Sequence, residues 1–284
     1  MLQRLSMIAL SFALLAAWPL SVVAGTSGEA TATLGDTSLE VFTYRPGGCT
    51  PIGLLLVFHG VDRNAATYRD NARPLADRFC LLVAAPLFDA ERFPTWRYQR
   101  GGIVHDGRIQ DSALWTGWFV VKLADWLRQQ EARPDLPYWV IGHSAGAQFL
   151  SRFAAFIPNQ ARRSVIANPS TWVLPSLADA VPYGFGGVPA AETLLRRYLA
   201  APVTVLLGEE DTGSKHLVEN DEAEAQGATR YARGESTFHL AEAVARRRGW
   251  AFNWRLVEVP GVGHNARTMF ASPMAADALG LPGP

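Results

Sequence analysis

The chain has 284 residues, with 26 basic and 26 acidic side chains, and 49% of its residues are hydrophobic. That apolar content is too high for a disordered chain, and the balanced charge gives no electrostatic reason to expect nucleic acid or an anionic membrane as a partner. A chain of this length suits one large domain with a sizeable core.

The first 24 residues have the pattern of a secretory signal peptide. A basic residue, Arg4, precedes an apolar run over residues 5–15, and small residues follow near Ala24, where we expect cleavage. The alternative is a membrane anchor, but polar residues interrupt the run, which is shorter than the about 20 apolar residues of a span. We therefore expect residues 25–284 to form an exported domain with no membrane association after cleavage.

Short apolar runs alternate with helical stretches along the rest of the chain, which is typical of a mostly parallel sheet covered by helices. After a weak hairpin, we expect strands over residues 53–58, 80–85, 138–141, 164–167, 203–207 and 253–259. Apolar residues at helical spacing predict helices over residues 65–78, 113–128, 145–156 and 238–248.

Two long irregular segments, residues 87–110 and 169–189, follow predicted strands. Both are therefore expected at the carboxyl edge of the sheet, where open α/β proteins bind ligands. Their aromatic side chains are candidates for the lining of an acyl or aromatic pocket, and they serve equally well to pack the segments down. The candidates for this pocket are Trp96, Tyr98, Trp172, Tyr183 and Phe185.

A Gly-X-Ser-X-Gly pattern occupies residues 142–146 (GHSAG), directly after an apolar strand and directly before a helix. A sharp strand-to-helix turn of this kind exposes the serine hydroxyl above the sheet edge, and the glycines permit the crowded backbone. The helix behind the serine directs N–H groups toward developing negative charge. We therefore predict that Ser144 is a nucleophile, and the alternative is a structural turn with an incidental serine.

A serine nucleophile needs a base, and six histidines compete for this role. His264 lies in a glycine-flanked loop after the last predicted strand, from which it can reach the serine. Asp211 follows the strand at 203–207 and would orient the base, with Glu209 and Glu210 as rivals. The order serine, aspartate, histidine is one known chain order for such a triad, so we predict Asp211 as the acid and His264 as the base.

An oxyanion formed on the substrate needs two backbone N–H donors. One should come from Ala145, directly after the nucleophile. The other should come from the His-Gly-Val sequence that follows the strand at 53–58, and we predict the N–H of Val61.

These motifs, in the order FHG, GHSAG, GEEDT and GVGH, resemble those of bacterial α/β hydrolases over nearly the whole mature chain. Within them the sequence looks most similar to exported esterases that include polyhydroxybutyrate-depolymerase-like and feruloyl-esterase-like enzymes. The resemblance implies an α/β-hydrolase fold in a single domain, with a mostly parallel central sheet flanked by helices. It also implies the triad and oxyanion residues named above, and neither a metal nor an organic cofactor.

Two cysteines, Cys49 and Cys80, precede and begin two strands that are expected to be neighbours in this fold. Adjacent strands lie about 4.8 Å apart, which is compatible with the usual Cα separation in a disulfide. Export would supply the oxidising compartment. We therefore expect a disulfide at the amino edge of the sheet, and the alternative is two buried free thiols.

The predicted function is hydrolysis of a carboxylic ester through an acyl-enzyme, in the periplasm or outside the cell. The substrate would be a small-molecule or oligomeric ester, and the sequence sets no oligomeric state. One alternative is an amidase or peptidase with the same triad, and another is a non-catalytic binding protein on the same fold. Oxidation with a dinucleotide cofactor is disfavoured, because no glycine-rich fingerprint follows a predicted strand.

Overall fold

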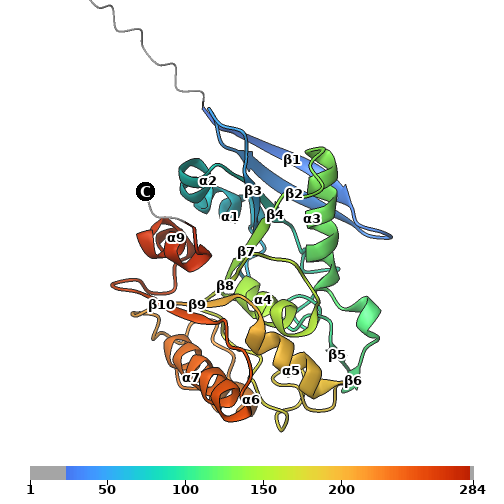
Figure 1. Cartoon of the computed structure of the whole chain (residues 1–284), viewed down its shortest axis with the longest axis vertical. Helices are drawn as coiled ribbons and strands as arrows, with labels where there is room; N and C mark the ends of the chain where they lie inside the picture. Colours follow the sequence, from blue (N-terminus) through green and yellow to red (C-terminus); the bar gives the residue numbers. More distant parts are fainter. Residues whose placement is uncertain (1–23, 282–284) are drawn as a thin grey trace, which may run out of the picture.

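A central eight-stranded sheet organises the protein, as the computed structural model of residues 24–281 shows (Figure 1). Its strands stand in the order β1-β2-β4-β3-β7-β8-β9-β10. The pairs from β4 to β10 are parallel, whereas β1, β2 and β4 pair in antiparallel fashion. The predicted α/β fold with a mostly parallel sheet is thereby confirmed. The predicted signal peptide, residues 1–24, lies outside the described residues except for Ala24.

The strand bounds follow the predicted apolar runs closely. The sheet consists of β1 (Thr26–Thr33), β2 (Ser38–Arg45), β3 (Gly53–Phe58), β4 (Leu81–Pro86), β7 (Tyr138–His143), β8 (Ser164–Ala167), β9 (Val203–Gly208) and β10 (Arg255–Val259). A separate short hairpin joins β5 (Val104–His105) to β6 (Arg108–Ile109).

Helices cover both faces of the sheet (Figure 1). They are α1 (Ala65–Asn71), α2 (Arg73–Phe79), α3 (Trp118–Gln130), α4 (Ala145–Phe156), α5 (Ala191–Ala200), α6 (Asp221–Glu224), α7 (Arg230–Arg248), α8 (Ala266–Ala271) and α9 (Pro273–Leu279). A 3-10 turn, η1 (Ser112–Leu114), precedes α3. Among residues 24–281, no helix combines the length and the apolar character needed to cross a membrane.

The alternation of side chains along β3 divides the core into two layers. Leu54, Leu56 and Phe58 pack into the core beneath α3, α4, α5 and α7, whereas Leu55 and Val57 pack into the core beneath α1, α2, α8 and α9. Successive side chains of a strand point to opposite faces. An unbroken apolar run such as GLLLVF therefore indicates a strand that is buried on both faces, and every residue of β3 is buried.

Three predicted helices have different bounds in the structure. The helix expected over residues 65–78 is two helices that meet at Ala72. Pro74 lies in the first turn of the second helix, where backbone N–H groups have no partner within the helix, so the N–H that proline lacks costs no hydrogen bond. Helix α3 starts later than expected, after η1. Helix α7 starts earlier, because the side chain of Thr229 accepts a hydrogen bond from Ala232 N–H and caps its first turn.

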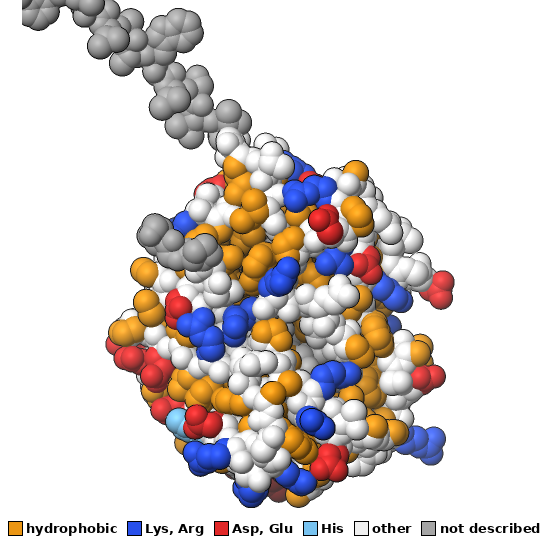
Figure 2. All heavy atoms as spheres, in the orientation of Figure 1, with side chains coloured by type: hydrophobic (Ala, Val, Ile, Leu, Met, Phe, Trp, Pro, Cys, Tyr) orange, Lys and Arg blue, Asp and Glu red, His pale blue; other side chains and the backbone are white. Residues whose placement is uncertain are grey.

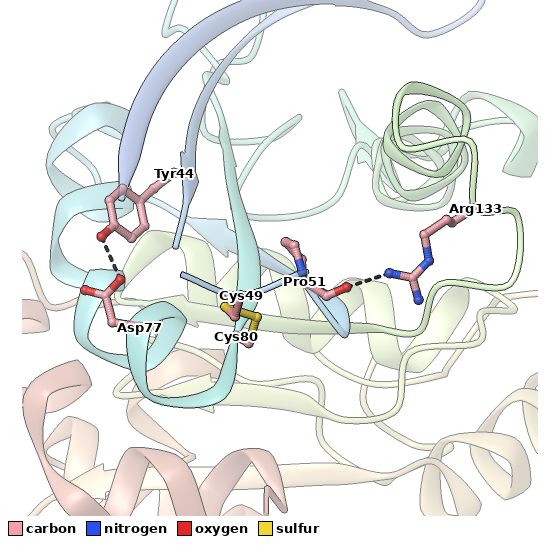
Figure 3. The surroundings of a disulfide bond; sticks show 6 residues. All are labelled: Tyr44, Cys49, Pro51, Asp77, Cys80 and Arg133. Carbon is pink, nitrogen blue, oxygen red and sulfur yellow. Dashed lines mark hydrogen bonds between the residues drawn. A yellow bond between two sulfur atoms is a disulfide. The ribbon is translucent and has the colours of Figure 1, made fainter. Parts of the chain in front are cut away.

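The predicted disulfide between Cys49 and Cys80 is present, with Cα atoms 6.2 Å apart (Figure 3). Cys80 ends α2 in the left-handed conformation, and its carbonyl accepts a hydrogen bond from the N–H of Ile52. The bridge therefore joins the chain just before β3 to the chain just before β4. It lies at the amino edge of these two parallel strands, opposite to the edge where β7 leads into α4.

Reduction of the disulfide is expected to lower the free energy of unfolding by about 4 kcal/mol in the chain-entropy model, because the bridge closes a loop across a sequence separation of 31 residues. For a chain of this size the melting temperature should fall by about 8 to 16 °C. Thermal melting with and without reductant measures the change, and the double variant Cys49→Ala/Cys80→Ala should show no further effect of reductant. Two free thiols in the denatured, unreduced protein would contradict the bridge.

Candidate active site

Ser144 occupies a strained turn between β7 and α4. Its backbone has a φ of 58° and a ψ of −117°, a conformation that non-glycine residues rarely adopt. The N–H of Ser144 donates to the carbonyl of Ala167 on β8 at 3.0 Å, which ties the turn to the sheet. The residue is 8% exposed, so its hydroxyl reaches the surface only through the cleft described below.

The two glycines of the motif permit a close approach of backbone segments. A Cβ on Gly142 would lie 2.6 Å from the carbonyl carbon of Gly146, and a Cβ on Gly146 would lie 2.2 Å from the carbonyl oxygen of Phe58 at the end of β3. Both distances are shorter than any real Cβ contact. The pattern Gly-X-Ser-X-Gly is therefore a steric requirement of this turn.

The structure brings Ser144, His264 and Asp211 together in one hydrogen-bonded chain. The hydroxyl of Ser144 lies 3.0 Å from Nε2 of His264, and Nδ1 of His264 lies 2.6 Å from Oδ2 of Asp211. With the proton on Nδ1, that nitrogen donates to the carboxylate and Nε2 is free to accept the serine proton. The Asp211 side chain is 1% exposed, whereas the His264 side chain is 28% exposed.

The loops after β9 and β10 carry Asp211 and His264 and contact each other through their backbones. The N–H of Glu210 donates to the carbonyl oxygen of Val262 at 3.0 Å, and a Cβ on Gly208 would lie 2.3 Å from that oxygen. The rivals for the acid, Glu209 and Glu210, are both exposed, whereas Asp211 is buried against the histidine. Of these three acidic residues, Asp211 is the one whose carboxylate is hydrogen-bonded to His264.

Arg230 is part of this site, although nothing in the sequence pattern indicated it. It lies on the first turn of α7, and its Nη1 is 3.4 Å from Oδ1 of Asp211, the carboxylate oxygen that does not face His264. Burial lowers the pKa of Arg230, and the charge of Asp211 opposes that shift. Arginine stays protonated in proteins, so the pair is a buried ion pair.

A second histidine, His143, packs beneath the first. Its ring centroid lies 4.5 Å from that of His264, and its Nδ1 lies 3.3 Å from the hydroxyl of Tyr68. Burial lowers the pKa of His143 well below the ordinary value, and the neighbouring His264 and Arg230 lower it further. His143 is therefore a neutral packing partner of His264.

The His-Gly-Val loop after β3 is held rigidly by His59. Its Nδ1 donates to the carbonyl of Gly60 at 2.9 Å, its Nε2 accepts from the N–H of Phe88 at 3.0 Å, and its own carbonyl accepts from the hydroxyl of Tyr98. Val61 follows in this loop, is 41% exposed and lines the cleft at Ser144. Ala145 begins α4 and is buried directly behind the serine.

A cleft with a volume of about 1280 Å³ opens over Ser144 and His264. Its walls come from the loop and helices after β3, the loop after β9, and the loop and helix after β10. Four basic and five acidic side chains line it: Arg73, Lys215, Arg230, Arg267, Asp62, Asp70, Asp77, Glu210 and Asp211. The face of the molecule drawn in Figure 2 also shows basic, acidic and hydrophobic side chains interspersed.

None of the five aromatic residues considered as pocket candidates, Trp96, Tyr98, Trp172, Tyr183 and Phe185, lines this cleft. Trp96 stacks on His105 with ring centroids 4.0 Å apart, and Tyr98 is fully buried. Trp172 is 0% exposed and Tyr183 is 6% exposed. Tyr98, Trp172 and Phe185 belong to the core beneath α3, α4, α5 and α7, so these rings pack the two long segments onto the sheet.

The parallel sheet, with a serine in a strained turn at its carboxyl edge, defines a protein of the hydrolase class. Neither a family model nor a curated protein matches the sequence. Among solved structures, it is similar to the poly(3-hydroxybutyrate) depolymerase LpqC from Bordetella parapertussis, with 33% identity, coverage of 91% of this chain and 92% of that chain, and a TM-score of 0.83.

A second solved structure of comparable similarity is poly(aspartic acid) hydrolase-1 from Sphingomonas sp. KT-1, with 31% identity, coverage of 90% of this chain and 97% of that chain, and a TM-score of 0.82. An S-formylglutathione hydrolase from Agrobacterium tumefaciens, with 15% identity, coverage of 91% and 97%, and a TM-score of 0.57, shares the fold alone. The chain belongs to the α/β-hydrolase superfamily, as its motifs predicted, and it is a hydrolase.

The burial of His59 predicts a loss of stability in acid. Burial lowers the pKa of His59 from 6.5 to about 4. The unfolded chain therefore binds a proton between these values that the folded protein does not bind. The free energy of unfolding is highest above about pH 6.5 and falls as the pH decreases toward 4, by up to about 1.4 kcal/mol per pH unit for this residue.

The variant His59→Asn isolates this contribution, because it has no imidazole to protonate. Urea unfolding of both proteins at pH 7.0 and pH 5.0 measures it. On acidification the parent protein should lose about 2 kcal/mol more than the variant. An equal loss in both proteins would show that His59 is not held neutral by burial.

Proposed function

We propose that the protein is an exported serine hydrolase that cleaves carboxylic esters through an acyl-enzyme. One observation carries this proposal, namely the hydrogen-bonded chain from Ser144 Oγ to His264 Nε2 at 3.0 Å and from His264 Nδ1 to Asp211 Oδ2 at 2.6 Å. This arrangement of nucleophile, base and acid is recognised by geometry and not by sequence position.

In the proposed reaction, the Ser144 hydroxyl attacks the ester carbonyl while its proton moves to Nε2 of His264. Asp211 holds the imidazole with its proton on Nδ1 and stabilises the imidazolium. The N–H groups of Val61 and Ala145 donate to the oxyanion of the tetrahedral intermediate. The imidazolium then returns its proton to the leaving alcohol, and a water molecule activated by the same histidine hydrolyses the acyl-enzyme.

The cleft supports a short, polar and uncharged ester as the substrate. Few large apolar side chains line it, and Val61, Tyr68 and Pro74 are among them. Its acidic and basic side chains nearly balance, so neither a long fatty acyl chain nor a polyanion has an obvious complement there. The name of the LpqC relative describes a depolymerase of a neutral polyester, which agrees with a small-molecule or oligomeric ester.

Amide hydrolysis is the second candidate, because the relative from Sphingomonas is named as a hydrolase of poly(aspartic acid). Both reactions pass through the same type of intermediate, so the triad does not separate them. The near balance of charge in the cleft favours the neutral ester over a chain of carboxylates. A non-catalytic binding protein, the third alternative, has no need for a strained serine within 3.0 Å of a histidine.

The disulfide supports export to the periplasm or the medium. Disulfides persist in oxidising compartments and are rare where thiols are kept reduced, and Cys49 and Cys80 are bridged. Together with the predicted signal peptide at residues 1–24, this supports a location outside the cytoplasm.

The substitution Ser144→Ala tests the proposal most simply. It should lower ester turnover by about 10⁴- to 10⁶-fold, because the nucleophile is lost. It should leave the melting temperature nearly unchanged, because alanine removes only the hydroxyl and keeps the same backbone conformation. The assay uses p-nitrophenyl esters of increasing acyl length, a feruloyl ester, hydroxybutyrate oligomers and a poly(aspartic acid) sample. Hydrolysis of poly(aspartic acid) in preference to every ester would favour the amidase, and retention of more than a few per cent of activity would exclude Ser144.

A further inference from the structure

Two arginines are buried on the first turns of α7, three residues apart. Arg230 and Arg233 are each 1% exposed, and both donate to backbone carbonyls of the loop between β9 and α6. Of the two, Arg230 also reaches the carboxylate of Asp211, whereas the other contacts of Arg233 are to backbone carbonyls. A buried ion pair is costly to form and is weak evidence for stability. A functional effect on Asp211 is therefore the more informative explanation of this contact.

We propose that Arg230 is a positioning residue that fixes the carboxylate of Asp211 and thereby the orientation of His264. The inference rests on the proposed function, in which Asp211 is the acid of the triad. Oδ1 of Asp211 lies 3.4 Å from Nη1 of Arg230, and Oδ2 lies 2.6 Å from Nδ1 of His264. The carboxylate is held at both oxygens, so it cannot rotate without losing one of these contacts.

Arg230 also places a positive charge beside the buried acid. The Asp211 side chain is 1% exposed, and taking a carboxylate out of water is costly unless a cation or hydrogen bonds compensate. Arg230 supplies a cation that does not lose its proton, and its Nη1 lies at Oδ1, the carboxylate oxygen that does not face His264.

The same guanidinium connects the acid to the wall of the cleft. Nη1 of Arg230 donates to the carbonyl of Gly213 at 3.2 Å, and Nη2 donates to the carbonyl of Lys215 at 2.5 Å. Gly213, Lys215 and Arg230 itself line the cleft. One buried side chain thus contacts both Asp211 and the loop that lines the cleft.

Arg233 is a matched control for these effects. Its Nη1 donates to the carbonyls of Ser170 at 2.6 Å and Val218 at 3.0 Å, and its Nε donates to Gly227 at 2.7 Å. It shares the helix, the burial and the supported loop with Arg230. Its hydrogen bonds go to backbone carbonyls and not to Asp211, so a purely structural role predicts similar effects from the two arginines.

The test is a double-mutant cycle on the full-length protein with a p-nitrophenyl ester as the substrate. Arg230→Met should lower kcat by about 10- to 100-fold, the scale of a misplaced catalytic group, and change KM by less than about 3-fold. In the Asp211→Asn background the same substitution should lower kcat by less than about 3-fold, because the carboxylate through which Arg230 acts is gone. Arg233→Met should leave kcat within about 3-fold of the parent.

Each outcome bears on one claim. Equal losses of kcat from Arg230→Met in both backgrounds, or from Arg230→Met and Arg233→Met, would overturn the positioning role and leave a structural one. Full activity in Asp211→Asn alone would overturn the assignment of the acid, and with it the proposed function. If Arg230→Met does not fold, Arg230→Lys in both backgrounds provides the same comparison, because it keeps the charge and loses the planar fork.

Discussion

The backbone contact between the loops after β9 and β10 is the constraint on which the site depends. Gly208 lies so close to Val262 that any side chain there would collide with the backbone, and Glu210 donates a hydrogen bond to the same residue. This contact lets two residues that are 53 positions apart share a short hydrogen bond. The parallel pairing of β9 with β10 brings the two loops to one edge of the sheet, and the glycine lets them meet.

The rest of the molecule supplies rigidity to that edge. The strained backbone of Ser144 is held between the buried strand β7 and the fully buried helix α4. The long segment after β8 is anchored by another buried arginine, Arg152 of α4, which donates to the carbonyls of Thr171, Trp172 and Pro182. Burial lowers the pKa of Arg152 to about 10, so it stays charged at neutral pH. Strain at a functional site persists only when its surroundings hold it in this way.

The sequence predicted the parts of the structure that depend on local pattern. Strands β3 and β8 and helix α4 have the predicted bounds, because continuous apolar runs and a glycine-flanked turn leave few alternatives. The grouping of Ser144, Asp211 and His264 followed from their order after successive strands. Arg230 could not be predicted, since its role depends on a fold that buries the start of α7 against the loop after β9. The aromatic rings of the irregular segments could not be assigned either, because the same side chains suit a pocket and a core.

Covalent labelling is the most direct test of the proposal that Ser144 is the nucleophile. Incubation with a fluorophosphonate, followed by mass spectrometry of proteolytic fragments, shows which side chain is activated. We predict one adduct per chain, on the fragment that contains Ser144, and strongly slowed labelling in the variant His264→Ala, which lacks the base. An unlabelled protein, or an adduct on another residue, would contradict the account.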